Sequence, residues 1–112
     1  MAVDDKCACT RWAVVDAGGG LVRSFGATNS VQVTVGIYRV LFDTNVTDCA
    51  YVATIGLPGA GNPPAGEIAV ASDPANPNAV RVDTYGSAGA GNPADRPFHL
   101  AVHCAPGGGG ED

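Results

Sequence analysis

Four cysteines are the residues of this chain whose chemistry is most constrained by spacing. One residue separates Cys7 from Cys9, whereas Cys49 and Cys104 stand alone. Zinc sites built from four thiolates usually contain cysteine pairs with two residues between them, and this sequence has no such pair. The spacing favours disulfide bonding over metal binding. We therefore expect no metal ion and no cofactor.

Cys49 and Cys104 are placed to form a disulfide with each other. Cys49 opens one predicted strand and Cys104 closes another, so their sulfur atoms meet if the two strands run antiparallel. The bond would close a long loop and stabilise the fold by roughly 4 kcal/mol. Cys7 and Cys9 would point to one side of an extended segment about 6.6 Å apart, and we expect free thiols or bonds between subunits. Disulfide bonding indicates an oxidising, extracellular setting.

His99 and His103 are the next candidates, because a spacing of four would let a helix present both to one metal ion. Residues 98–104 alternate between apolar and polar side chains, so we expect a strand, on which the two imidazoles lie about 13 Å apart. We interpret them as surface residues. Asp95 and Arg96 are interpreted as a loop ion pair or a turn cap. Because the sequence contains neither Gly-x-Ser-x-Gly nor a phosphate loop, we expect no catalytic residues and no enzyme.

Two long loops contain the same pentapeptide, Gly-Ala-Gly-Asn-Pro, at residues 59–63 and 89–93. Aromatic side chains could accompany these loops in a sugar site, because an aromatic ring suits the face of a carbohydrate. Trp12 and Tyr38 are expected to pack in the core, which leaves the other tyrosines for the surface. The candidate ligand-binding residues are therefore Tyr51, Tyr85, Asn62 and Asn92.

Charge and hydropathy narrow the classes of partner. Six Lys and Arg stand against eleven Asp and Glu, which gives a net charge of −5. The basic residues are scattered, whereas binding to phosphate backbones needs clustered positive charge, so nucleic acid is excluded as the main partner. No run of 18 apolar residues is present, so we expect no membrane insertion. Such a weakly charged surface suits contact with other subunits or with neutral sugars.

A two-residue alternation of apolar and polar side chains dominates the chain and predicts half-buried antiparallel strands. Clusters of Gly and Pro separate these segments. This pattern predicts an all-β fold, an antiparallel β-sandwich of about eight short strands with a jelly-roll-like character. We expect an N-terminal extension over 1–10, the sandwich over 11–105 and a flexible Gly-rich tail over 106–112. The predicted strands are 11–16, 21–25, 30–35, 37–43, 49–55, 67–72, 79–85 and 98–104.

Several blocks of the sequence resemble a known type of domain. These are Arg-Trp-Ala-Val-Val-Asp at 11–16, Gly-Ile-Tyr-Arg-Val-Leu-Phe at 36–42 and the blocks at 46–56 and 96–104. Over roughly residues 11–104 the chain resembles a small all-β module of actinobacterial secreted proteins of unassigned function. Similar blocks occur at the ends of phage tail-fibre and collagen-like surface proteins. The resemblance implies a compact sandwich like the jelly-roll heads of trimeric fibres, with Cys49 and Cys104 in matching positions.

Two functions follow as hypotheses. The first is a non-enzymatic structural or adhesive module, extracellular or on a virion surface, that forms a homo-oligomer with a trimer favoured. Its other partners would be a virion protein or a cell-surface glycan. The alternative is a secreted monomeric module that binds a carbohydrate or another ligand through the two Gly-Ala-Gly-Asn-Pro loops.

Overall fold

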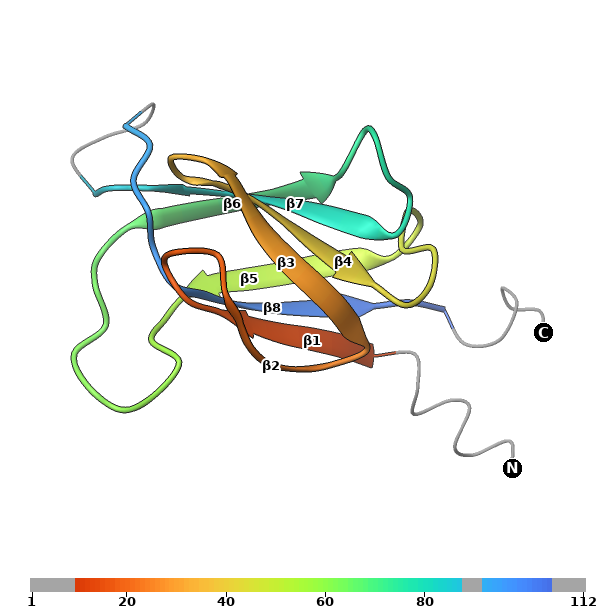
Figure 1. Cartoon of the computed structure of the whole chain (residues 1–112), viewed down its shortest axis with the longest axis horizontal. Helices are drawn as coiled ribbons and strands as arrows, with labels where there is room; N and C mark the ends of the chain where they lie inside the picture. The colour runs from red at the N-terminus through yellow and green to blue at the C-terminus, as the bar shows by residue number, and fades with distance from the viewer. Residues whose placement is uncertain (1–9, 88–91, 106–112) are drawn as a thin grey trace.

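The computed structural model describes residues 10–87 and 92–105. This part of the chain contains eight strands and no helix (Figure 1). The predicted extension and tail, with Cys7 and Cys9, lie outside the described residues, except that Thr10 already belongs to the first strand. The strands are β1 (Thr10–Val15), β2 (Leu21–Phe25), β3 (Ala27–Thr34), β4 (Ile37–Phe42), β5 (Ala50–Ile55), β6 (Glu67–Ser72), β7 (Ala79–Tyr85) and β8 (Phe98–His103).

Two four-stranded sheets face each other across the core. Sheet A has the order β2-β1-β8-β5 and sheet B the order β3-β4-β7-β6, and every neighbouring pair is antiparallel. The predicted antiparallel sandwich of eight short strands is therefore confirmed. Three hairpins, β1–β2, β3–β4 and β6–β7, join neighbours within a sheet, and β8 returns to lie between β1 and β5.

The core is formed by the inward-facing, alternate residues of the two central strands of each sheet, which are β1 and β8 in sheet A and β4 and β7 in sheet B. On β8, Phe98, Leu100 and Val102 are at most 2% exposed, and β4 contributes Tyr38 and other buried residues from sheet B. The rings of Tyr38 and Phe98 meet edge to face, with their centroids 5.2 Å apart. The Tyr38 hydroxyl donates a hydrogen bond to the Ala17 carbonyl at 2.6 Å. The predicted core position of Tyr38 is confirmed.

The chain turns a corner at Gly26 to pass from sheet A to sheet B. Only this residue separates β2 from β3, and its φ of 87° is one that side chains disfavour. A Cβ there would lie 2.6 Å from Cγ of Arg11, whose Nε is 2.7 Å from Oδ1 of Asp43. The predicted start of the third strand at residue 30 was therefore too late, because the corner lets pairing begin at Ala27.

The disulfide between Cys49 and Cys104 is present, as predicted. Ala50 and His103 are paired at the ends of β5 and β8, so the cysteines form the next cross-strand pair. Their Cα atoms lie 4.4 Å apart, which matches the close pairs of an antiparallel ladder. The bond therefore extends the pairing of two strands that already lie in register.

Carboxylates close two of the turns. Oδ1 of Asp16 accepts hydrogen bonds from the backbone N–H groups of Gly18 and Gly20 in the β1–β2 turn. Oδ1 of Asp95 accepts from Gly36 N at 2.8 Å and from Gln32 Nε2 at 2.6 Å. The predicted turn-cap role of Asp95 is thereby confirmed, although the turn that it caps belongs to a distant hairpin.

Replacing Cys49 and Cys104 by alanine should lower the free energy of unfolding by about 4 kcal/mol, because the unfolded chain regains the entropy of a 55-residue loop. Urea denaturation followed by circular dichroism measures this difference. The comparison is best made with Cys7 and Cys9 replaced by serine in both proteins, which prevents thiol exchange. A loss of about 1 kcal/mol or less would contradict the expectation.

Burial raises the pKa of Tyr38 above its usual value of 10.0, and the negative charge of Asp95 raises it further. As the pH rises past about 10, the unfolded chain therefore ionises this phenol before the folded chain does. The free energy of unfolding should fall over this range in urea titrations. Tyr38→Phe should reduce the pH dependence of the free energy of unfolding in this range. At neutral pH it should lower that free energy by about 1 kcal/mol, because the hydrogen bond to Ala17 is lost. If the free energy of unfolding depends on pH in the same way in Tyr38→Phe as in the parent, groups other than Tyr38 cause the fall.

Candidate binding face on sheet A

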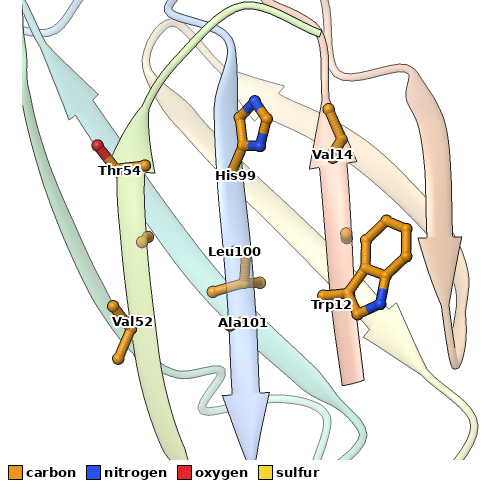
Figure 2. A pocket seen from close by; sticks show the side chains of 9 residues that line it. Trp12, Val14, Val52, Thr54, His99, Leu100 and Ala101 are labelled. Atoms are coloured by element: carbon orange, nitrogen blue, oxygen red, sulfur yellow. The ribbon is translucent and has the colours of Figure 1, made fainter. Parts of the chain in front are cut away.

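The outer face of sheet A carries an open trough of about 330 Å³ that crosses three of its four strands, β1, β8 and β5 (Figure 2). Its outward-facing lining is apolar apart from the indole N–H of Trp12, the hydroxyl of Thr54 and the imidazole of His99. The side chains that define this trough are Trp12 and Val14 from β1, His99 and Ala101 from β8, and Val52 and Thr54 from β5.

Cross-strand register explains why the face is hollow at its middle. Ala101 pairs with Trp12 on one side and with Val52 on the other, so a single methyl group lies between two larger side chains. Two residues along β8, at the next outward position, His99 pairs with Val14 and Thr54. The trough therefore has its smallest outward side chain at Ala101 and becomes more polar toward His99 and Thr54.

A loop folds back over one end of the trough and is held there by two side chains of the sheet. His99 Nε2 lies 2.8 Å from the Leu57 carbonyl oxygen, and Arg23 Nη1 donates to the Pro58 carbonyl at 2.8 Å. A carbonyl can only accept, so Nε2 of His99 carries the hydrogen of this bond, and Nδ1 can accept only in the neutral imidazole. Leu57 and Pro58 begin the loop that contains the first Gly-Ala-Gly-Asn-Pro segment.

Trp12 corrects one sequence-based expectation, because its side chain is 39% exposed instead of buried in the core. On β1, Ala13 and Val15 point inward. Trp12 precedes Ala13 by one residue, so it faces outward by alternation. In Figure 2 its indole ring is seen broadside beside β1. This is the only tryptophan of the chain.

The four predicted ligand-binding residues do not form one site. Tyr85, at the end of β7, pairs with Glu67 and bridges to Pro93, which places it at the base of both long loops. Asn62 and Asn92 are exposed on those loops. Residues 88–91 of the second loop lie outside the described part of the chain.

Tyr51 lies at the opposite end of the sandwich, beside the disulfide. Its side chain is half-buried against the core, and its hydroxyl contacts the Val46 carbonyl at 2.6 Å and Ser72 Oγ at 2.8 Å. Tyr51 was expected at the surface, and the structure places it half-buried with its hydroxyl bonded within the fold. Its inward position follows from β5, where alternate residues pack on the core and Val52 and Thr54 face the trough instead.

The two histidines have separate surroundings. His103 is exposed and its Nδ1 lies 3.2 Å from Thr10 Oγ1, whereas His99 is half-buried in the trough. Within residues 10–87 and 92–105, no three His, Cys, Asp or Glu side chains gather in a way that could hold a metal ion. Both imidazoles lie on the outer side of β8, as the strand pattern predicts.

The outer face of sheet B differs in character. Arg39 and Arg81 are cross-strand partners at its centre, and each is paired with a carboxylate. The Arg39–Asp73 and Arg81–Asp83 ion pairs have N–O distances of 2.7 and 2.8 Å. The open apolar trough of sheet A is the better candidate for a binding site.

The fold and this face define the class of the protein as a small, disulfide-bonded antiparallel β-sandwich with an apolar trough on one sheet. No protein-family model, curated protein or solved structure matches the chain. Among the described residues, no helix is long and apolar enough to cross a membrane. The resemblance to actinobacterial secreted modules and fibre heads stays a prediction.

Replacing His99 and Arg23 together by alanine should release the loop at Leu57 and Pro58. Loss of two hydrogen bonds of about 1 kcal/mol each would raise the opening equilibrium by roughly thirtyfold. Limited digestion with proteinase K, a protease of broad specificity, read by mass spectrometry should then show faster cleavage within residues 56–62. His103→Ala serves as the control, since its imidazole does not contact this loop in the structure. Equal cleavage rates in the double variant and the parent would show that other contacts hold the loop.

Proposed function

We propose that this protein is a non-enzymatic structural or adhesive module that assembles with copies of itself on the outside of a cell or virion. The observation that carries the proposal is an uncovered apolar surface on β2, β3 and the turn that follows β3. We call it the assembly surface, and its members are Val22, Phe25, Val31, Val33 and Val35.

The assembly surface concentrates most of the large apolar side chains that the fold leaves in water. Seven such residues are exposed in the described part of the chain, and five of them lie between Val22 and Val35 with exposures from 41 to 56%. The other two, Trp12 and Val52, line the trough. Val22 and Phe25 lie on the edge strand of sheet A and the other three on or just after the edge strand of sheet B, and these two edges contact each other. Exposed apolar side chains at such a place are typical of a surface that another molecule covers.

The two edge strands of sheet B show that this exposure is specific to one side. Edge strands are usually protected by charge, proline or shortness, yet β3 has eight residues with neither a charge nor a proline. On the opposite edge, β6 presents the small side chains of Ala69 and Ala71 at the corresponding outward positions. This difference favours an interface at β3 and not at β6.

The expected location and symmetry rest on different grounds. The Cys49–Cys104 disulfide fits an oxidising compartment, which supports an extracellular or virion-surface position. A closed homo-oligomer would cover the assembly surface of every copy, and the resemblance to trimeric fibre heads favours three subunits. A virion protein or a cell-surface glycan would be the further partner.

A second candidate function is a secreted carbohydrate- or ligand-binding module. Its support comes from the trough on sheet A, which has an exposed indole ring, and not from the four residues that the sequence indicated. The first Gly-Ala-Gly-Asn-Pro loop contributes indirectly, because its beginning at Leu57 closes one end of the trough.

Val31→Lys combined with Val33→Lys should convert the oligomer to monomer, because two charges would have to be desolvated in the interface. The mass in solution, measured by analytical ultracentrifugation over a range of concentrations, gives the oligomeric state. We expect the dissociation constant to rise by at least about a hundredfold, which corresponds to about 2.7 kcal/mol.

Ala69→Lys combined with Ala71→Lys is the matched control. It adds the same two charges at outward positions on the other edge of the same sheet, so the oligomer should persist. A parent protein that stays monomeric at high concentration would contradict self-assembly. Loss of the oligomer in both double variants would contradict the placement of the interface at β3.

A further inference from the structure

We propose that the trough on sheet A binds a neutral saccharide, with one pyranose ring stacked on Trp12 and the adjoining ring over Ala101, toward Thr54 and His99. This inference deepens the second candidate function and does not depend on self-assembly. It assigns a ligand class to a face whose residues, apart from Trp12, were not among the sequence-based candidates for sugar binding.

The apolar part of the trough matches the apolar part of a sugar. A β-pyranose presents axial C–H bonds on its two faces and hydroxyl groups around its edge. The indole ring of Trp12 is a flat surface open to solvent, and Ala101 with Val52 continues an apolar floor from it. A pyranose lying parallel to the sheet would cover these groups with its C–H face and leave its hydroxyl groups at the rim.

The polar part of the trough, at Thr54 and His99, offers hydrogen-bond acceptors at the end nearest the Leu57 loop. The Thr54 hydroxyl donates its hydrogen to the Ile55 carbonyl at 3.2 Å, so its oxygen remains able to accept. The Leu57 carbonyl orients the ring of His99, whose Nδ1 is a second acceptor in the neutral imidazole. Sugar hydroxyls can donate to both groups. The acceptors therefore stand where the edge of a second ring would reach.

Charge selects the neutral class of saccharide. No ionised side chain belongs to the lining of the trough, and the nearby Arg23 already donates to the Pro58 carbonyl. A carboxylated or sulfated sugar would have to lose water from its charge over an apolar floor without gaining a partner, which costs free energy. The net charge of −5 also disfavours an anionic ligand.

The dimensions suit two rings lying across the strands. From β1 to β5 the trough crosses two strand spacings, or about 10 Å. The loop at Leu57 limits the trough at its His99 end. An oligosaccharide would therefore enter from the Trp12 side and run over β8. A linear β-linked oligosaccharide of glucose or N-acetylglucosamine, in which all ring substituents are equatorial, fits this flat path.

The experiment is a fluorescence titration of the full-length protein with cellotetraose and with chitotetraose. Because Trp12 is the only tryptophan, its emission reports on the trough alone. We expect a saturable change in emission with at least one of the two sugars. Ala101→Leu, which fills the trough between Trp12 and Val52, should weaken binding at least tenfold. Thr54→Val should weaken it about three- to tenfold, as expected for one lost hydrogen bond.

Ala69→Leu is the matched control, because it adds the same side chain at an outward position on sheet B and should bind like the parent. Circular dichroism of each variant establishes that the sandwich is intact. The assembly variant with Val31→Lys and Val33→Lys should also bind like the parent, so that failure of one proposal is distinguishable from failure of the other.

Three results would overturn the saccharide proposal. The first is the absence of any saturable change with both sugars, and the second is unchanged affinity in Ala101→Leu. Tighter binding of trigalacturonate than of either neutral sugar would overturn the neutral class. If neither sugar binds and Ala101→Leu converts an oligomeric parent to monomer, the saccharide proposal is overturned and the trough is instead an interface with a second copy of the chain.

Discussion

The insertion of β8 between β1 and β5 is the constraint on which the rest of the structure depends. Its residues Phe98, Leu100 and Val102 are at most 2% exposed, and both of its edges are paired. A slip of one residue would expose all three to water, so the register is strongly determined. The same alternation that buries these residues turns His99 and Ala101 outward. The floor of the trough is therefore a direct consequence of the core.

The two sheets share this core but present different outer faces. Sheet B neutralises its central arginines with Asp73 and Asp83, which gives a charged surface with its pairs already formed. Sheet A has apolar side chains on both faces of β1, so that Val14 is only 4% exposed on the outer side while Trp12 stays open. A sheet with two apolar faces needs cover on both, and this is the physical basis for proposing a ligand site on sheet A.

The long loops leave the sandwich from a firmly bonded base. Thr84 is fully buried, and its hydroxyl donates to the Ala94 carbonyl at 2.6 Å. Arg96 Nε donates to the Ala65 carbonyl at 2.8 Å, which ties the second loop to the first. Because these bonds lie below the exposed Asn62 and Asn92, the loop tips can change in sequence without disturbing the sheets.

The amino-acid sequence by itself located all eight strands, with only the start of β3 placed too late, and it identified the inward faces of β4, β7 and β8 from their two-residue period. It also indicated the disulfide, since Cys49 opens one predicted strand and Cys104 closes another.

Only the tertiary structure decided the face of Trp12 and the partners of Tyr51. The run from Trp12 to Val15 is apolar at every position, so alternation could not say which face is buried, and the pairing of β1 with β8 settled it. The trough likewise joins residues from three strands far apart in the chain, whose proximity arises from cross-strand register and not from sequence spacing.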